Sequence, residues 1–519
     1  MSHRNSGIIA AGSPQVAEAA AETLRAGGNA FDAAIAAAWA SFIAETPLTS
    51  AGGAGFMLTH TASGEQTLFD FFSQTPRHKR PESELDFYPV SIDYGGSTQV
   101  FHSGLGSIAM PGNVAGLFHV HRRLGRIPFK ELIQPALSMA RDGFTVGKFF
   151  AYCAKLVSPT MTSQPTGKAF FMPDGRLPEE GDTFAIPDFA DTLEYLGTHG
   201  PEEFYFGEIA RKIAEECQNR GGYLTREDFE KYQVIERRPL YTSYRDHVAC
   251  TNPAPSAGGL LISLTLKLLE KQPLRSWGQG SPKHLQALLS ALCLTKQGRE
   301  ERLDPDMYRE GLSGHLLDEQ YLSYMQAQLD GRVSKIGSTT HFTVADSEGN
   351  IASMTSSTGE GSGFAVPGTQ IMLNNMLGEE DLNPTGFHKW PANRRITSMM
   401  APTLLLKDGA PVLATGSGGA NRIRSVIAQV ISNQVDFNLR IEDNVYSPRM
   451  HWEDNHLDLE PGFPSASVEA LLEANSQFSH RLWEELGFYF GGAHTLTFDK
   501  DGSMHGVGDR RRIGTMLRS

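Results

Sequence analysis

The alternation of apolar and polar residues predicts a β-hairpin about two-thirds of the way along the chain. From Thr340 the pattern alternates through Phe342 and Val344, which is the period of a half-buried strand. Residues 346–350 are typical of a turn, and residues 351–355 continue as a second strand. On this evidence alone, Thr340 and the residue before it are ordinary β-forming residues at the start of a strand.

Helical spacing of apolar residues predicts most of the elements before residue 300. Ser13 and Pro14 are a typical start for a helix that runs through Leu24 and ends at the glycines beyond it. Residues 30–44 are rich in alanine, with aromatic residues at helical spacing, and predict a helix packed in the core. Further helices are predicted over 129–141, 204–220, 260–269 and 422–437, and further strands over 67–72, 370–375, 400–406 and 411–415. The charged segment 299–332 is expected to be a solvent-exposed connection.

Composition changes this picture little, but it excludes some functions. The 519 residues are 40% apolar and 20% charged, which is typical of a globular protein with a sizeable core. The net charge of -13 argues against nucleic acid and anionic membrane as partners, and no apolar run approaches the length of a membrane span. The N-terminus lacks the apolar region of a signal peptide, and the four cysteines lie far apart. We therefore expect a cytoplasmic protein without a bound metal or cofactor.

Two glycine-rich turns stand next to predicted strands. Residues 49–58 lead into an apolar strand, and their glycines serve either as a ligand cradle or as a crowded packing site. Residues 416–421 lead into the helix predicted from Arg422. Backbone N–H groups at such a turn and helix N-terminus form a positive pocket that suits an oxyanion.

Thr339 becomes a candidate catalytic nucleophile if the chain is cut before it. Its α-amine is then free beside its own hydroxyl, which gives a nucleophile with a built-in base. An α-amine has a reference pKa of about 7.7–8.0, which is well matched to general-base catalysis near neutral pH. The small side chains of Gly337 and Ser338 leave room for the strained backbone that such a cut requires.

Several short motifs occur together along most of the chain, and each is weak alone. They are residues 27–34, 52–56, 110–116, 134–136, 140–143, 255–259, 339–342, 373–375, 398–403 and 416–419. Taken in this order, they resemble the γ-glutamyltranspeptidase family (γ-glutamyltransferases, or glutathione hydrolases) of N-terminal-nucleophile hydrolases.

The resemblance implies a fold and a maturation step. The fold is α+β: a four-layer αββα sandwich of two stacked, mostly antiparallel sheets between helical layers. The precursor is expected to cleave itself between Ser338 and Thr339. Residues 1–338 then form a large subunit and residues 339–519 a small one, interleaved in one globular domain; whether two such pairs form a heterotetramer is left open. Thr339 is expected to attack an amide and form an acyl-enzyme that water or an acceptor amine resolves.

The resemblance also assigns the catalytic roles around Thr339. The oxyanion donors fall on the backbone amides of Gly419 and Ala420, or on those of Gly418 and Gly419 if the alignment slips by one. The hydroxyl that supports the amine of the nucleophile falls on Ser357, where the family commonly has threonine.

The substrate-binding positions match the family less evenly. Thr358 lies near the position of a substrate-contacting asparagine, and Glu379 takes the place of the acid that holds the α-amine of the substrate. Of a serine pair that contacts the α-carboxylate, Ser398 matches and the second position is Met399. Phe72 replaces an arginine that clamps this carboxylate in better-known members. Four other arginines are candidates to replace that clamp: Arg77, Arg394, Arg395 and Arg422.

The sequence therefore leaves a main hypothesis and three alternatives. The main hypothesis is a self-processing enzyme that cleaves γ-glutamyl amides such as glutathione. The second keeps the threonine chemistry but changes the acyl group, as in glutaryl (cephalosporin) acylases or oxamate amidohydrolase. The third is an uncleaved, non-catalytic scaffold, and the fourth is an unrelated α+β protein. For the enzymes, the expected partners are a small amide or γ-glutamyl peptide and the two fragments of one precursor.

Overall fold

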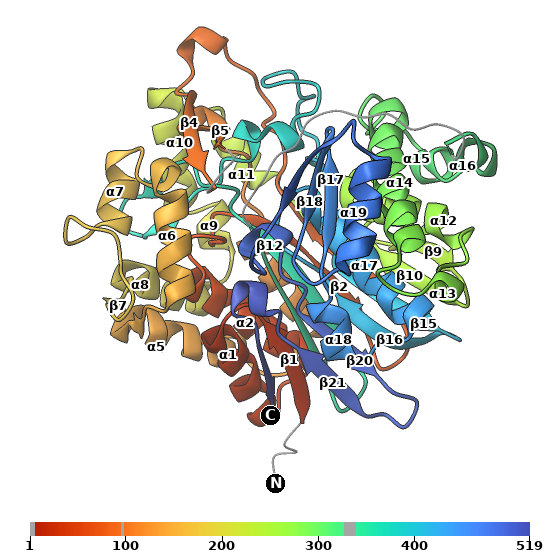
Figure 1. Ribbon diagram of the computed structural model, residues 1–519. Coiled ribbons are helices and arrows are strands. Elements are labelled where there is room, and N and C mark those ends of the chain that lie inside the picture. Colours follow the sequence, from red (N-terminus) through yellow and green to blue (C-terminus); the bar gives the residue numbers. More distant parts are fainter. Residues whose placement is uncertain (1–5, 95–97, 326–338) are drawn as a thin grey trace.

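Two antiparallel sheets form the centre of the molecule in a computed structural model that describes residues 6–94, 98–325 and 339–519 (Figure 1). The seven-stranded sheet has the order β22-β1-β11-β12-β2-β3-β8, and the six-stranded sheet the order β21-β20-β16-β15-β10-β9. The strands of the first are β1 (Gly7–Ala11), β2 (Ala54–His60), β3 (Gln66–Phe71), β8 (Ile235–Arg237), β11 (Thr340–Asp346), β12 (Ile351–Ser357) and β22 (Thr515–Arg518). Those of the second are β9 (Leu240–Tyr244), β10 (His247–Thr251), β15 (Thr403–Lys407), β16 (Ala410–Thr415), β20 (Thr495–Phe498) and β21 (Met504–Val507).

Helices cover the outer face of each sheet. On one side they are α1 (Pro14–Arg25), α2 (Ala30–Ala44), α3 (Asn113–Leu124), α4 (Phe129–Leu132), α5 (Gln134–Asp142), α6 (Lys148–Met161), α7 (Pro165–Phe171), α8 (Pro187–His199), α9 (Glu202–Tyr205), α10 (Glu208–Arg220) and α11 (Arg226–Glu230). On the other they are α12 (Ala257–Glu270), α13 (Leu274–Trp277), α14 (Pro282–Gly298), α15 (Leu312–Leu316), α16 (Glu319–Met325), α17 (Arg422–Phe437), α18 (Ile441–Tyr446) and α19 (Ser465–Ala474). Short strands complete the chain: β4 (Tyr88–Asp93), β5 (Thr98–Ser103), β6 (Phe144–Thr145), β7 (Thr183–Phe184), β13 (Ala365–Val366), β14 (Ile371–Met372), β17 (Met450–Glu453), β18 (His456–Leu459) and β19 (Ser479–Leu482).

Alternating side chains of the seven-stranded sheet enter two different cores. Along β1, Ile9 and Ala11 pack with the first group of helices, whereas Ile8 and Ala10 pack with residues of the six-stranded sheet and of α12 and α17. Successive residues of a strand point to opposite faces, so both faces of this sheet are buried. The order of layers is helix, sheet, sheet, helix, which confirms the predicted α+β sandwich.

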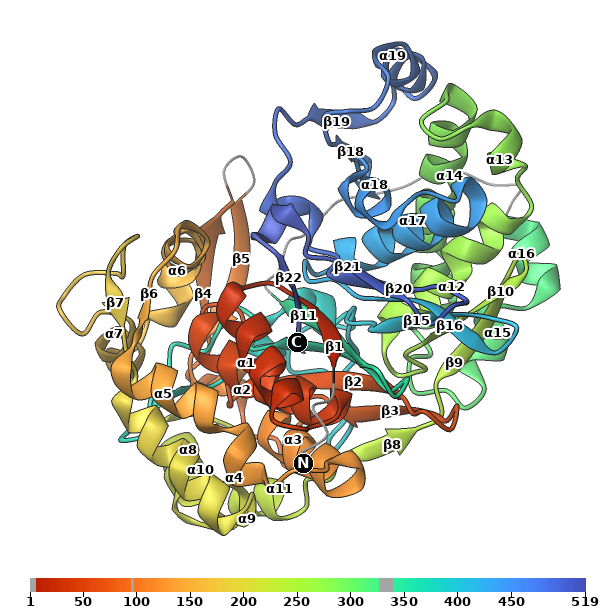
Figure 2. The same ribbon diagram turned by 90° about the horizontal axis from the view of Figure 1, so that it is seen from below.

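Strands from before and after Thr339 are interleaved in the seven-stranded sheet. β1 lies between β22 and β11, and β12 pairs with β2 (Figure 2). A cut before Thr339 would therefore leave two pieces that share one sheet and one core. The division into 1–338 and 339–519 stays a prediction.

Most predicted elements are present, including both hairpins and the helix over 422–437. The prediction of a half-buried strand at 340–346 was wrong: every residue of β11 is buried, because helices cover one face and the second sheet the other. The predicted helix over 129–141 is divided into α4 and α5, and that over 204–220 into α9 and α10. The strand predicted over 370–375 is only two residues long.

The segment 299–332 is also less exposed than predicted. Its described part carries α15 and α16, whose Leu316, Tyr321 and Leu322 are buried in the second core. The prediction relied on the many charged residues of this segment and missed the apolar residues between them, which form the buried face of each helix. Residues 326–332 lie outside the described part of the chain. None of the described helices is both long and apolar enough to cross a membrane.

Candidate active site

Thr339 stands immediately before β11, in the middle of the seven-stranded sheet, and only 5% of its surface is exposed. The antiparallel register pairs Thr340 of β11 with Ser356 of β12. One further step along the same register places Ser357 opposite Thr339. Ser357 is buried and its hydroxyl accepts a hydrogen bond from the backbone N–H of Gly359 at 2.9 Å. The structure therefore brings together the predicted nucleophile and the hydroxyl predicted to support it.

The turn between β16 and α17 packs against the backbone of Thr339. A Cβ atom added to Gly418 would lie 2.1 Å from the carbonyl oxygen of Thr339, so only glycine fits there. Gly419 and Ala420 have positive φ angles of +115° and +46°. Their carbonyl oxygens accept the N–H groups of residues 422 and 423, and no acceptor for their own N–H groups lies within the described residues. This geometry supports the expectation that amides of the turn serve as oxyanion donors.

A small pocket opens at Thr339, with a volume of about 30 Å³. It is lined by Phe72, Thr339, Ser357, Met376, Glu379, Asp381, Leu382, Ser398, Met399, Met400, Ala420 and Ile423. Six of the residues predicted for the site therefore share it with the nucleophile: Ser357, Ala420, Glu379, Ser398, Met399 and Phe72. Ser398 is fixed here because its hydroxyl accepts the N–H of Met400 and its carbonyl accepts the N–H of Gly258.

Phe72 forms an apolar wall of this pocket. Its ring stacks on that of Phe56, with the centroids 5.2 Å apart. Among the lining residues the charged side chains are Glu379 and Asp381, both acidic. No described residue that lines the Thr339 pocket therefore brings a cationic side chain to a bound carboxylate.

None of the four candidate arginines lines the pocket: Arg77, Arg394, Arg395 and Arg422. Arg395 lies behind Phe72, where its guanidinium pairs with Asp70 at 3.3 Å and donates to the carbonyl oxygen of Phe72. Arg422 donates to the carbonyl oxygen of Tyr489 at 2.8 Å. The guanidinium of Arg394 lies over the ring of Tyr308. The structure thus supplies no replacement for the missing clamp.

Glu379 carries the strongest electrostatic perturbation in the pocket. Its Oε1 atom is buried and has no hydrogen-bond partner among the described residues. Burial raises the pKa of this carboxyl well above its ordinary value, and the nearby carboxylates of Glu360 and Asp381 raise it further. A cationic group of a ligand would relieve this unfavourable environment.

Three of the described positions predicted for the site do not line the pocket. Thr358 does not line the pocket; its hydroxyl donates to that of Ser50 at 3.1 Å, because the residue after Ser357 at the end of a strand points away from the site. Gly418 and Gly419 do not line it either, although Gly418 contacts the backbone of Thr339. Ser338, predicted at the cleavage site, lies outside the described residues.

The glycines of residues 49–58 serve packing. A Cβ atom on Gly53 would lie 2.4 Å from the carbonyl oxygen of Ser357, and one on Gly52 would lie 2.3 Å from that of Met372. Neither glycine lines the Thr339 pocket. Of the two functions left open by the sequence, the structure supports the crowded packing site, which holds the end of β12 in place.

Two charged residues beside the nucleophile were missed by the sequence analysis. The guanidinium of Arg512 donates to the carbonyl oxygen of Thr339, and the carboxyl of Glu45 accepts from the hydroxyl of Thr340. Both side chains are buried, and burial lowers the pKa of Arg512 to about 10. The position of Glu45, an acidic residue directly after the alanine-rich stretch over 30–44, could have marked it as a functional candidate. Arg512 follows two other arginines, and nothing in the sequence distinguishes it from them.

His341 directs both of its ring nitrogens to residues other than Thr339. Its two ring nitrogens are hydrogen-bonded to the hydroxyls of Thr355 and Thr343, at 2.9 and 3.0 Å. Burial, with His494 nearby, lowers its pKa well below the ordinary value and keeps the ring neutral. Among the described residues, no three His, Cys, Asp or Glu side chains gather as metal ligands would.

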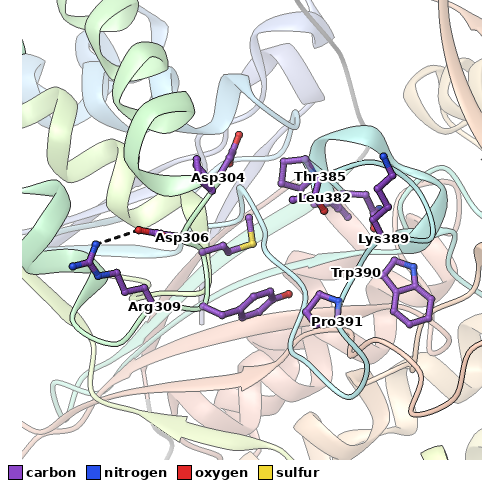
Figure 3. Close-up of a pocket in the computed structure, with 13 residues that line it drawn as sticks. Asp304, Asp306, Arg309, Leu382, Thr385, Lys389, Trp390 and Pro391 are labelled. Atoms are coloured by element: carbon purple, nitrogen blue, oxygen red, sulfur yellow. Dashed lines mark hydrogen bonds and ion pairs between the residues drawn. The ribbon is translucent and has the colours of Figure 1, made fainter.

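A larger hollow of about 400 Å³ shares one lining residue, Leu382, with the Thr339 pocket. Figure 3 shows that Asp304, Asp306 and Trp390 surround it together with Arg309, which pairs with Asp306 at 3.1 Å. This hollow has both charges and an aromatic wall, so it can accept polar and apolar groups.

Solved structures share this fold. A cephalosporin acylase from Bacillus halodurans matches with a TM-score of 0.88 at 24% sequence identity, covering 99% of this chain and 96% of that one. The γ-glutamyltranspeptidase of Helicobacter pylori matches with a TM-score of 0.54 at 27% identity, covering 62% of this chain and 91% of that one. The fold is therefore that of the N-terminal-nucleophile hydrolases of this type.

Sequence comparison then shows the family. The profile of the gamma-glutamyltranspeptidase family matches residues 16–519. A glutathione hydrolase proenzyme of Escherichia coli (strain K12) is 31% identical over 98% of this chain and 90% of that protein. An acylase ACY 1 proenzyme of Pseudomonas sp. (strain SE83) is 28% identical over 98% of this chain and 93% of that protein.

The chain belongs to the γ-glutamyltranspeptidase family, as the sequence motifs predicted. It is therefore an enzyme of the hydrolase and transferase class, and the alternative of an unrelated α+β protein was wrong.

Proposed function

We propose that this enzyme is a self-processing threonine amidohydrolase whose preferred acyl group carries no carboxylate at the Phe72 end of the pocket. The observation that carries the proposal is the lining: Phe72 and Met399 stand where a carboxylate would need partners, and the nearby charges are acidic. A buried carboxylate without a cation is costly, and like charges add to that cost.

Thr339 supplies the chemistry in this proposal. During maturation its hydroxyl attacks the carbonyl carbon of residue 338, the peptide C–N bond breaks, and water hydrolyses the resulting ester. The freed α-amine then takes the proton from the Thr339 hydroxyl as that oxygen attacks the carbonyl carbon of an amide. The amide C–N bond breaks, the proton passes to the leaving amine, and the acyl group stays on Thr339 as an ester until water or an acceptor amine removes it. Ser357 lies opposite to support the amine, and the N–H groups of the turn at Gly419 and Ala420 hold the oxyanion.

The leaving group is proposed to occupy the hollow of Figure 3, because this hollow shares the lining residue Leu382 with the Thr339 pocket. Water entering the same way completes hydrolysis, whereas an acceptor amine bound there completes transfer. The volume of about 400 Å³ is large enough for a leaving group much bigger than the acyl group.

A γ-glutamyl amide is the second candidate for the donor. The carboxyl of Glu379 lines the pocket and would suit an α-amine, and relatives such as that of Escherichia coli are named glutathione hydrolase proenzymes. Glutaryl and oxamate donors are weaker candidates, because each places a carboxylate in the acidic pocket.

Four p-nitroanilides separate these donors: γ-glutamyl, glutaryl, 4-aminobutyryl and butyryl. They form a matched set, since glutaryl lacks only the amine of γ-glutamyl, 4-aminobutyryl lacks only its carboxylate, and butyryl lacks both. We expect kcat/KM for 4-aminobutyryl to exceed that for γ-glutamyl by about tenfold or more, which corresponds to about 1.4 kcal/mol. Faster turnover of the γ-glutamyl compound would contradict the proposal and favour the second candidate.

A further inference from the structure

A second cavity lies on the other side of the strand that carries Thr339. Its volume is about 310 Å³, and it is bounded by the starts of α1 and α6 and the end of α2, which lie on the same side of the molecule in Figure 1. It shares no lining residue with the Thr339 pocket. Most of the wall is apolar, with Pro47, Leu48, Phe144, Phe149, Phe150, Cys153 and Ile513. The volume is in the range of small-ligand sites, about 300–1,000 Å³.

Glu45 gives this apolar cavity one polar anchor. Its carboxyl lies at the end of α2, is 4% exposed and lines the cavity. One carboxyl oxygen, Oε2, accepts the hydroxyl of Thr340. The other, Oε1, has no hydrogen-bond partner among the described residues and points towards Gly12, which also lines the cavity. A buried carboxyl oxygen without a donor costs about 1–3 kcal/mol or more.

Groups of the protein compensate only part of the cost of burying Glu45. The hydroxyls of Thr340 and Ser13 and the charge of Arg512 act on its carboxyl, yet burial outweighs them and raises the pKa of the group. No ion pair joins Glu45 and Arg512 among the described residues. The Nε and Nη2 atoms of Arg512 also have no partner there. Lys148 lines the cavity at its exposed edge. A ligand with an ammonium group would therefore supply the hydrogen-bond donor that Oε1 of Glu45 lacks.

We propose that this cavity binds a small apolar amine, with the apolar body against the aromatic wall and the ammonium group on Oε1 of Glu45. The site is separate from the catalytic pocket, but Glu45 also holds Thr340, the residue next to the nucleophile. An occupant is thus coupled to Thr339 through one hydrogen bond. The proposal does not depend on the acyl group that the enzyme accepts.

Benzylamine and benzyl alcohol test the site as a matched pair, because they differ mainly in the charged group. Isothermal titration calorimetry on the purified enzyme, without substrate, should show benzylamine binding about tenfold or more tightly than benzyl alcohol, and the same ranking should appear as a rise in Tm. Glu45→Gln should remove this preference while the apolar wall stays intact. Thr339→Ala should still bind the amine more tightly than the alcohol, because the nucleophile does not line the cavity.

Gly147→Trp is a second variant that leaves Glu45 untouched. Gly147 lines the cavity, has an ordinary φ of −92°, and a Cβ atom there meets no atom within 4 Å. The indole ring should therefore fill the opening without unfolding the protein, and it should abolish binding of both compounds. Equal affinity for amine and alcohol, no binding to the native enzyme, or binding that survives Gly147→Trp would each overturn the proposal.

Discussion

The rings of Phe72 and Phe56 stack with their centroids 5.2 Å apart at the wall of the Thr339 pocket. This contact fixes an apolar surface at the position where better-known relatives are expected to hold a carboxylate with arginine. Arg395 lies behind it but is already engaged by Asp70 and by the backbone of Phe72. In our proposal this wall determines which acyl group the enzyme accepts, whereas Thr339 supplies the nucleophile.

Phe72→Arg should give the pocket the cation that it lacks. A bidentate guanidinium–carboxylate contact is among the stronger hydrogen-bonded pairs, so kcat/KM for glutaryl p-nitroanilide should rise by about tenfold relative to the butyryl compound. Phe72→Leu is the matched control, since it removes the stacking on Phe56 without adding charge, and it should leave the glutaryl-to-butyryl ratio unchanged. If both variants shift the ratio equally, the effect comes from lost packing and the charge argument fails.

Glu379 should make the preference for an amine depend on pH. Its pKa is raised, so the carboxyl is still protonated at pH values where an ordinary glutamate is ionised. The negative charge that attracts an ammonium group appears as the pH rises through this raised pKa and is lost again as the pH falls. The ratio of kcat/KM for 4-aminobutyryl over butyryl p-nitroanilide should therefore increase with pH above the ordinary glutamate value.

Glu379→Gln is the control for this pH dependence. The amide keeps the shape of the side chain but cannot ionise, so the ratio should become flat across the same pH range. A ratio that still climbs in the variant would assign the titration to another group, with Asp381 the first to examine because it lines the same pocket.

Gly418→Ala should damage the site through backbone packing alone. The new methyl group would lie 2.1 Å from the carbonyl oxygen of Thr339, so either the turn or the nucleophile must move. We expect kcat to fall by about tenfold or more, since small displacements of reacting groups are costly. Gly314→Ala is a suitable control, because its Cβ atom meets nothing within 4 Å, and it should retain full activity.

The sequence predicted the local elements of this site well. Period-2 and helical patterns located β11, β12 and α17. The resemblance to the family then assigned roles to Thr339, Ser357 and the glycine turn. Burial of both faces of β11 was missed, because periodicity within one strand cannot show how many layers cover it. The sequence also left the packing function of Gly53 open, because the residue it packs against, Ser357, is far away in the sequence.

Long-range polar contacts were the hardest part to predict. Arg512 reaches Thr339 across 173 positions of the chain, and Glu45 reaches Thr340 across 295. No spacing rule connects such residues, because they meet only after two sheets and two helical layers have assembled. Thr358 does not line the pocket, because adjacent residues at a strand end point to opposite sides and Ser357 faces the pocket.

The intact mass of the purified, denatured protein tests the central claim most directly. We predict two fragments, with N-terminal sequencing showing that the smaller one begins at Thr339, and a single uncleaved and inactive chain for Thr339→Ala. Thr340→Ser is the neighbouring control and should still be cleaved, because it keeps the hydroxyl that contacts Glu45. A native protein that remains one chain of 56.7 kDa, or a Thr339→Ala variant that is still cleaved or active, would contradict the assignment of Thr339 as the nucleophile.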